Sequence, residues 1–322
     1  MPATIRRADT SDADLGAVAA VVNEAIPEWP TDVDSMRRED ALYPGIVRFI
    51  VEQDGRAVGV GIVGRIYIHP PEYDALWATV AVTPESRRRG IGGRLLSETA
   101  EVARAAGKSA LHAPVSEERP DALSFLVHRG FREHARHKMV RLELEGRHPP
   151  ADVPPPGIAL TTLAERPELI EGVHAVAVEA FADIPGGDEP PAAGDLAEFR
   201  ARDVDWPTVP KDAFMIAIDR SSGSVVGYAN LVFPAGRTDY AYHDMTAVAR
   251  AWRGRGIALA LKRATIGWAI RHGLAYLETG NDPDNAPMRA VNARLGFRPR
   301  PDEVTMRGAL VDIPFRLPTL GA

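Results

Sequence analysis

Apolar and polar positions follow the same order of patterns in the two halves of the chain. In the first half, apolar residues recur at helical spacing over 15–26, and residues 47–51 alternate as in a β-strand. Asp54-Gly55 then marks a hairpin turn into a second strand over 57–63. The pattern predicts a helix followed by a β-hairpin, and the second half repeats it. The corresponding segments there are 169–181, 214–218 and 225–231.

A run of alternating strands and helices follows the hairpin in each half. In the first half a strand ends at Val82, a loop rich in glycine and arginine follows, and helical spacing covers 92–105. A further strand, a second helix and a Gly-Phe dipeptide before a last strand complete the run. This order predicts the α/β class, more narrowly an α+β fold in which helices flank a mixed central sheet. In the second half the strand ends at Val248, and the helix covers 258–271.

Four landmarks place the two halves in register with an offset of 166 residues. The longest is the loop Arg87-Arg88-Arg89-Gly90-Ile91-Gly92, which aligns with Arg253-Gly254-Arg255-Gly256-Ile257-Ala258. Because all four agree without a gap, we interpret the chain as a tandem duplication. The second copy carries a longer insert before its loop, which we place within 183–212. The other landmarks are Ala81-Val82 with Ala247-Val248, Gly107 with Gly273, and Gly130-Phe131 with Gly296-Phe297.

A proline-rich segment separates the two copies. Residues 147–157 hold five prolines in eleven positions, which can continue neither a helix nor a central strand. Such a composition favours a stiff, extended spacer. We therefore predict a domain over 1–145, a linker over 146–157 and a second domain over 158–322.

Composition excludes several classes of protein. Of the 322 residues, 45% are hydrophobic and 25% are charged, as in a soluble globular protein. The formal net charge of -6 does not favour a nucleic-acid partner, and no apolar run reaches the roughly 18–20 residues that a membrane span needs. Cysteine is absent, which excludes disulfides, cysteine nucleophiles and zinc–thiolate sites. In the first copy His112, His128, His134 and His137 show no metal-ligand spacing. We expect a cytoplasmic protein, a monomer or homodimer, without a metal.

The repeated loop carries the chemistry. A strand that runs into a loop rich in glycine and arginine and then into a helix forms a phosphate site, because the helix N-terminus presents free N–H groups. Glycines let the backbone approach phosphate oxygens, and arginines add charge-assisted hydrogen bonds. The alternative interpretation of the loop is an ordinary glycine-rich turn whose arginines are solvated. The loop is not a P-loop, since no Gly-Lys-Ser/Thr follows it.

Both loops match the Arg/Gln-x-x-Gly-x-Gly/Ala signature of the GCN5-related N-acetyltransferase (GNAT) superfamily. Residues 279–297 also resemble the Asn-rich second motif of that family, which ends in Gly-Phe. The resemblance covers nearly the whole chain as two units. It implies acyl-coenzyme A as the donor, with acetyl-CoA as the default, and direct attack of a neutral amine on the thioester.

The resemblance also implies which residues contact the donor. The strands before the loops align with the pantetheine arm, the loops hold the pyrophosphate, and the N–H of Val248 or Val82 stabilises the oxyanion. The implied residues are Val80, Ala81, Val82, Arg87, Arg88, Arg89, Gly90, Ile91 and Gly92 in the first copy, and Thr246, Ala247, Val248, Arg253, Gly254, Arg255, Gly256, Ile257, Ala258, Asn281 and Asn285 in the second.

The sequence departs from the family at the general acid. Many members carry a tyrosine four residues before the glycine of Gly-Phe, which protonates the leaving thiolate. The positions here are Leu126 and Asn292, and neither can act as this acid. Either the thiolate leaves unaided, or water or another group protonates it, or the activity is absent.

The second copy is the better candidate for chemistry. The first copy has Val115 and Arg119 where the second has Asn281 and Asn285, so it loses the second motif. We expect the first copy to bind coenzyme A yet to serve mainly as a scaffold and as walls of the acceptor site. The candidate bases in the second copy are Asp244 and Glu278, with His243 a weaker one; each can also be an ordinary strand residue.

The sequence says least about the identity of the acyl acceptor. Acidic residues crowd the insert of the second copy, and others gather near Glu28 in the first, so a small cationic amine fits both segments. Solvated loops are the competing interpretation. The rival functions are a CoA-binding or sensing module without turnover, a mycothiol-synthase-like acetyltransferase, and protein lysine acetylation. The acidic residues of the insert are Asp183, Asp188, Glu189, Asp195 and Glu198.

Overall fold

The chain folds into two units in a computed structural model that describes residues 3–151, 153–185 and 191–313. Unit 1 comprises Met1–Arg136 together with Glu303–Ala322, and unit 2 comprises His137–Asp302. Each unit is a mixed sheet flanked by helices, so the predicted fold class is confirmed. Within the described ranges no helix is both long and apolar enough to cross a membrane.

The sheet of unit 1 is mixed, with one parallel pair at its centre. Its order is β1-β2-β3-β4-β5-β13, and only β4 and β5 are parallel neighbours. The parallel pair is the one that the loop and its helix connect, as the β-α-β pattern predicted. The strands are β1 (Thr4–Arg7), β2 (Val47–Gln53), β3 (Arg56–Arg65), β4 (Ala75–Val82), β5 (Ala110–Ser116) and β13 (Glu303–Ala309).

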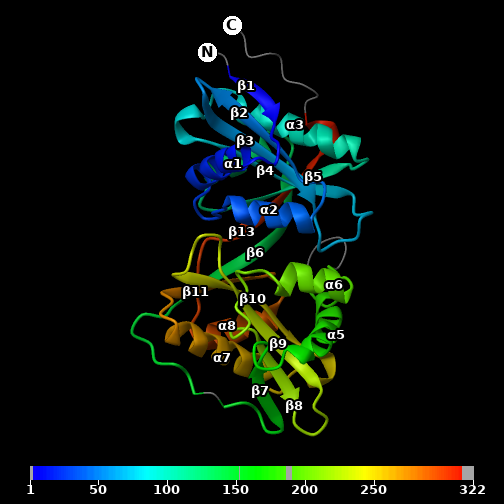
Figure 1. Ribbon diagram of the computed structural model, residues 1–322, viewed down its shortest axis with the longest axis vertical. Helices are drawn as coiled ribbons and strands as arrows, with labels where there is room; N and C mark the ends of the chain where they lie inside the picture. The colour runs from blue at the N-terminus through cyan, green and yellow to red at the C-terminus, as the bar shows by residue number, and fades with distance from the viewer. Residues whose placement is uncertain (1–2, 152, 186–190, 314–322) are drawn as a thin grey trace. The chain divides into compact units, whose positions relative to one another are not determined.

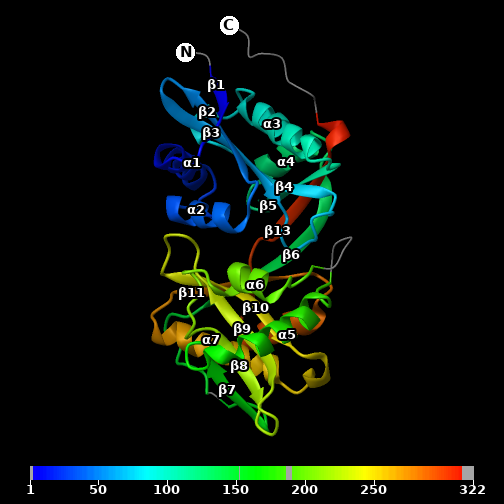
Figure 2. The same cartoon turned by 45° about the vertical axis from the view of Figure 1, so that its right-hand side comes forward.

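Helices cover both faces of this sheet. α1 and α2 lie on one face and α3 on the other (Figure 2). Ser11 and Asp32 start α1 and α2, because their side chains accept hydrogen bonds from backbone N–H groups of the first turn. Gly59 lets α3 come close, since a Cβ there would lie 2.8 Å from Cγ2 of Ile91. The helices are α1 (Asp12–Ala25), α2 (Val33–Leu42), α3 (Ile91–Ala105) and α4 (Pro120–Val127).

Unit 2 repeats this plan. Its sheet runs β6-β11-β10-β9-β8-β7, and β10 and β11 are the parallel pair. The short β12 (Arg298–Pro299) pairs with β6. The strands are β6 (Arg132–Glu143, in unit 2 from His137), β7 (Ile158–Thr162), β8 (Met215–Asp219), β9 (Val225–Val232), β10 (Tyr240–Val248) and β11 (Tyr276–Asn281).

Two apolar cores sandwich the sheet of unit 2. The first lies under α7 and includes Leu231, Ile257 and Leu261, and the second lies under α5 and includes Val173 and Ile216. The elements of unit 2 follow one another in the same order as those of unit 1, and α7 takes the place of α3 (Figure 1). The helices are α5 (Ile170–Phe181), α6 (Leu196–Phe199), α7 (Ile257–Arg271) and α8 (Ala286–Leu295).

The last strand of each copy belongs to the sheet of the other unit. β13, the final strand of the second copy, pairs with β5 of unit 1 from Ala110↔Ala309 to Ser116↔Glu303. The unit 2 part of β6, which ends the first copy, pairs with β11 from Tyr276↔Glu143 to Asn281↔Lys138. The predicted ranges 1–145 and 158–322 follow the repeat along the chain, whereas each compact unit takes one strand from the other segment.

Candidate functional site

The parallel strands of each unit pair over three residues and then separate. In unit 2 the last paired residues of β10 and β11 are Tyr242↔Glu278, and β10 continues alone to Val248. In unit 1 the last pair of β4 and β5 is Trp77↔His112, and β4 continues to Val82. We call these regions the divergence of unit 1 and the divergence of unit 2. Both end at the loop that the repeat marks.

The pairing register of β10 with β9 directs the backbone N–H of Val248 into the divergence. Ala249 N donates to Val226 O at 3.0 Å, so the next pair, Val248↔Gly227, is a non-hydrogen-bonded pair of the antiparallel ladder. The N–H of Val248 therefore points away from β9, toward the side where β11 has separated. Unit 1 has the same arrangement, because Thr83 N donates to Val58 O at 3.0 Å. An N–H in this position is available to a ligand.

The loops have the same backbone conformation in the two units. Gly90 and Gly256 are the N-cap residues of α3 and α7, with φ of 79° and 83°, and as glycines they have no side chain with which to cap these helices. Two residues earlier, Arg88 and Gly254 are also left-handed, with φ of 64° and 75°. Left-handed residues next to an uncapped helix N-terminus turn successive N–H groups toward one point, which is an anion site.

The first arginine of each loop braces the loop against the preceding strand. Arg87 Nε donates to Val82 O at 3.1 Å, and Arg253 Nε donates to Val248 O at 3.0 Å. Arg253 also forms an ion pair with Asp183 at 2.7 Å. The backbone N–H groups, with the exposed Arg88 and Arg89 in unit 1, remain for an anion.

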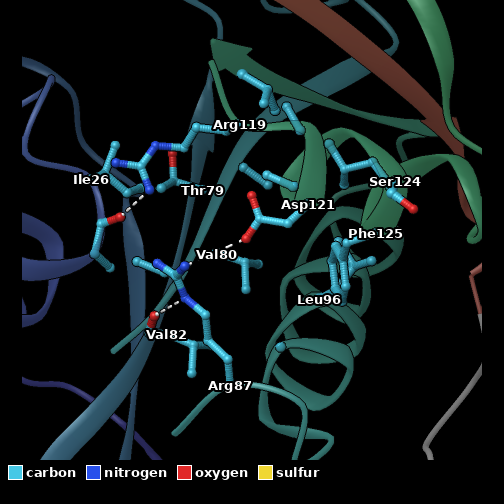
Figure 3. Close-up of a pocket in the computed structure, with 18 of the residues that line it drawn as sticks. Ile26, Thr79, Val80, Val82, Arg87, Leu96, Arg119, Asp121, Ser124 and Phe125 are labelled. Carbon is cyan, nitrogen blue, oxygen red and sulfur yellow. Dashed lines mark hydrogen bonds and ion pairs between the residues drawn. The ribbon is translucent and has the colours of Figure 1, made fainter. Parts of the chain in front are cut away.

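A pocket of about 610 Å³ lies in the divergence of unit 1. It extends from the loop, at Arg87, past Val80 on β4 to Phe125 on α4 (Figure 3). Its two lining carboxylates are both paired with arginine: Glu28 with Arg119, and Asp121 with Arg87 at 3.4 Å. Arg119 also donates to the Ala25 carbonyl at 2.6 Å. This pocket thus has an anion site at its mouth and an apolar wall, with its acids neutralised.

A β-bulge in the divergence of unit 2 has no counterpart in β4. The register of β10 against β9 shifts between His243 and Thr246, which adds one residue to the strand. Asn230 on β9, which is 1% exposed, holds the bulge. Its amide donates to Asp244 Oδ2 at 3.1 Å, and its carbonyl oxygen accepts from Met245 N at 3.1 Å. Sequence reasoning missed Asn230; a lone asparagine in the apolar run of β9 is the signal that could have found it.

Asp244 is directed by this bulge and carries no ion pair among the described residues. Its side chain is exposed, yet the loss of hydration among the surrounding protein atoms raises the pKa of its carboxyl, and the hydrogen bond from Asn230 opposes this rise. A carboxylate with a raised pKa is a better proton acceptor than an ordinary aspartate. The geometry is therefore compatible with the predicted role as a base.

The other two candidate bases are already engaged. Glu278 Oε1 forms an ion pair with Arg141 Nη2 at 2.7 Å, and its side chain is 12% exposed. His243 is 2% exposed, and its Nε2 lies 2.8 Å from Thr265 Oγ1. Burial lowers the pKa of His243 well below its usual value, so the ring is neutral at neutral pH. Both residues are held by the fold rather than free to take a proton from a substrate.

The two predicted asparagines hold the start and the inner face of α8. Asn285 caps α8, because its Oδ1 accepts from Met288 N at 3.2 Å. Asn281 Oδ1 accepts from Asn292 Nδ2 at 2.6 Å. These contacts occupy one group of each side chain, and Asn281 lies at the end of β11, beside the divergence.

Six positions that line the pocket of unit 1 are apolar there, and their equivalents in unit 2 are polar. The equivalent positions are those that the repeat aligns. Before the bulge the alignment shifts by one residue, because β10 has one residue more than β4 there. All six positions line the pocket of unit 1. Three of the unit 2 residues are at most 2% exposed: His243, Lys262 and Asn292. The pairs are Ala78 with His243, Val80 with Thr246, Leu96 with Lys262, Ala113 with Thr279, Val115 with Asn281, and Leu126 with Asn292.

The acidic insert residues are only partly in view. Asp183 pairs with Arg250 and Arg253, and the hydrogen bonds from Arg250 and then Arg253 lower the pKa of its carboxyl to about 2. Asp195 caps α6 by accepting from Glu198 N at 2.8 Å. Asp188 and Glu189 lie outside the described residues. The segments around Asp183 and Asp195 thus serve local structure.

Comparisons with known proteins agree with the geometry. The model of the acetyltransferase (GNAT) family matches residues 18–131 and 178–297, one region in each copy. A tandem GNAT protein from the clavulanic acid biosynthesis pathway is similar in structure, with a TM-score of 0.76, 22% identity, and 96% of this chain and 98% of that one covered. A GCN5-related N-acetyltransferase from Sphaerobacter thermophilus has a TM-score of 0.71 and 20% identity over 95% and 96% of the two chains. No curated protein matches the sequence.

Proposed function

The chain belongs to the acetyltransferase (GNAT) family, and on this premise we propose that it transfers an acyl group from acyl-coenzyme A directly to a primary amine of a small molecule. Acetyl-CoA is the proposed donor. The observation that carries the proposal is the divergence of unit 2, which brings together the anion loop at Gly256, the directed N–H of Val248 and the carboxylate of Asp244.

Each of these groups has a task in acyl transfer. The loop before α7 binds the pyrophosphate of the donor, and the edge of β10 that faces the divergence aligns the pantetheine arm. The amine attacks the thioester carbonyl, and the N–H of Val248 donates a hydrogen bond to the oxygen on which negative charge develops. Asp244 accepts the proton that the amine loses, which its raised pKa favours.

Unit 2 is the proposed site of turnover because the carboxylate in its divergence, Asp244, forms no ion pair with any described residue. The carboxylates that line the pocket of unit 1, Glu28 and Asp121, are both paired with arginine. The pocket of unit 1 nevertheless has the anion loop and a volume of about 610 Å³. We propose that unit 1 binds a coenzyme A molecule without turning it over and contributes to the stability of the whole chain.

Release of free thiol from acetyl-CoA, measured against a panel of amines with mass spectrometry of the products, tests the proposal. The panel includes polyamines, aminoglycosides, amino acids and a lysine peptide. We expect acetylated product with at least one small amine and more than about 10-fold less with the Asp244→Asn variant.

The second candidate function is a CoA-binding module without turnover, which the neutralised acids of the unit 1 pocket favour. Calorimetry distinguishes the two. Binding of coenzyme A with no product from any amine supports the binding module and contradicts the proposed enzyme. Acetylation of the lysine peptide alone points instead to a protein acceptor.

A further inference from the structure

We propose that Lys262 in unit 2 donates the proton that neutralises the leaving thiolate of coenzyme A. The inference rests on the acyl transfer proposed above. It assigns a proton donor to a chain whose sequence lacks the tyrosine expected in that role, since Asn292 stands at its position.

Lys262 lies inside unit 2, where a lysine is rarely placed without a partner. It is on α7 and is 1% exposed. Its Nζ lies 5.3 Å from the centre of the Phe297 ring. Among the described residues no hydrogen-bond acceptor or carboxylate pairs with this amine. Its equivalent in unit 1, Leu96, lines the pocket, so Lys262 occupies the wall along which a donor molecule would lie.

A second unsatisfied group lies on the same wall. Asn292 is 2% exposed, and its Oδ1 is buried without a hydrogen-bond partner while its amide nitrogen donates to Asn281. Asn292 and Lys262 are both next to Phe297, whose backbone N donates to Asn292 O at 3.1 Å. A buried acceptor without a partner is costly inside a protein, and here it belongs to the same wall as an amine for which the described residues supply no acceptor. Their presence together indicates that a polar ligand completes this wall.

The electrostatic surroundings suit a proton donor to sulfur. Burial lowers the pKa of Lys262 to about 7, whereas a free thiol has a pKa of about 8.5. The proton therefore moves downhill from the ammonium to the thiolate. Among the described residues, the titratable group that interacts electrostatically with Lys262 is His243 on β10, and its buried ring is neutral at neutral pH.

The step balances in atoms and charge. The amine nitrogen bonds to the acyl carbon, the carbon–sulfur bond breaks, and the electron pair of that bond goes to sulfur. The ammonium of Lys262 gives one proton to sulfur, which yields the free thiol and a neutral lysine. The attacking nitrogen, positively charged after it bonds to the acyl carbon, gives one proton to Asp244 and becomes the amide nitrogen. Asp244 releases that proton to water, and Lys262 takes a proton from water for the next cycle.

A change of leaving group tests the role of Lys262 directly. In the full-length Lys262→Met variant, single-turnover release from acetyl-CoA is expected to fall about 100-fold, in the range of general acid catalysis. The selenoester analogue of acetyl-CoA releases a selenolate, which is a much weaker base and needs no proton. With this donor we expect the variant to be slowed less than about 3-fold, whereas a lost positioning contact slows both donors equally.

The control is Lys108→Met, the same exchange at a lysine of unit 1 that donates to the Pro71 carbonyl. It is expected to change neither rate. Thermal unfolding of both variants shows whether they fold, and Lys262→Met is expected to be at least as stable as the wild type, because a buried unpaired amine is removed.

The pH profile of kcat provides an independent readout. In the wild type, kcat is expected to fall as pH rises through about 7 and Lys262 loses its proton, and this fall is absent in Lys262→Met. Equal slowing with both donors, an unchanged rate with acetyl-CoA, or an acetyl group found on Lys262 by mass spectrometry overturns the proposal. If the wild type turns over no amine, the acyl transfer itself fails; if it turns over and the variant matches it, only Lys262 is ruled out.

Discussion

The divergences of the two units share a backbone and differ in side chains. Both loops have the same pair of left-handed residues, and both strands before the loops direct an N–H toward the separated neighbour. The side chains differ at six equivalent positions, which are apolar in the pocket lining of unit 1 and polar in unit 2. The difference teaches that anion binding in this fold comes from backbone geometry, whereas proton transfer depends on side chains that each copy can change independently.

Exchanging a wall residue between the units has the largest expected effect. Leu96→Lys places an unpaired amine in the core cluster of unit 1 and is expected to cost about 3 kcal/mol of unfolding free energy or more. Lys262→Leu, the reverse exchange, is expected to be neutral or stabilising by about 1 kcal/mol. Urea denaturation of both variants measures this. Equal losses in the two variants would mean that the walls do not differ in the way described.

Removal of the carboxylate is next. Asp244→Asn keeps the hydrogen-bonding shape but cannot accept a proton, so the rate is expected to fall more than about 10-fold. Since the pKa of Asp244 is raised, the carboxylate forms only above that higher pKa, and the wild-type rate should rise as pH passes through it. The variant should lack this rise. An unchanged pH–rate profile would remove Asp244 as the base.

The two loop glycines show which anion site serves turnover. An alanine at φ near 80° is strained by about 1–2 kcal/mol, and this strain distorts the loop. Gly256→Ala is expected to raise KM for the acyl donor about 10-fold, whereas Gly90→Ala lowers only the CoA binding of unit 1, measured by calorimetry. The opposite result would move the chemistry to unit 1.

The bulge offers the smallest and most specific test. Asn230→Ala removes the amide that holds Asp244 and the Met245 N–H and is expected to cost about 1 kcal/mol of stability. The rate should fall less than in Asp244→Asn, because the carboxylate remains but is no longer directed. Asn230→Asp, which keeps the acceptor for Met245 N but places a second acid beside Asp244, is expected to shift the pH–rate profile upward. A profile identical to the wild type would contradict this.

The fold and the loops were predictable because their determinants are local. Hairpin turns, helical spacing and the repeated glycines of the loops all lie within a few residues of the feature that they specify. The engagement of Glu278 was not predictable, since its partner Arg141 lies on β6, more than a hundred residues away along the chain. The bulge at Asp244 depends on the side chain of Asn230 on the neighbouring strand, and no spacing along the sequence reveals that contact.

The exchange of final strands was also outside the reach of the pattern. β6 and β13 each end a copy as a strand, and neither the alternating burial of β13 nor the polar sequence of β6 says which sheet the strand joins. Which sheet a strand joins depends on which sheet edges meet in space, and the sequence of the strand alone does not specify this. The predicted linker assumes that each copy completes its own sheet. In the structure each sheet instead takes its last strand from the other copy.

The position of β13 has a consequence for biosynthesis. The open edge of β5 cannot be covered until Glu303–Ala309 has been made, long after the rest of unit 1 has left the ribosome. At about 5–20 residues per second this delay lasts roughly 10–35 s. During it, the nascent chain carries an open strand edge of the kind that attracts aggregation or chaperones. A fragment that ends at the proline-rich spacer lacks β13 and keeps this edge open permanently. The two halves of the chain therefore cannot be separated into two complete units.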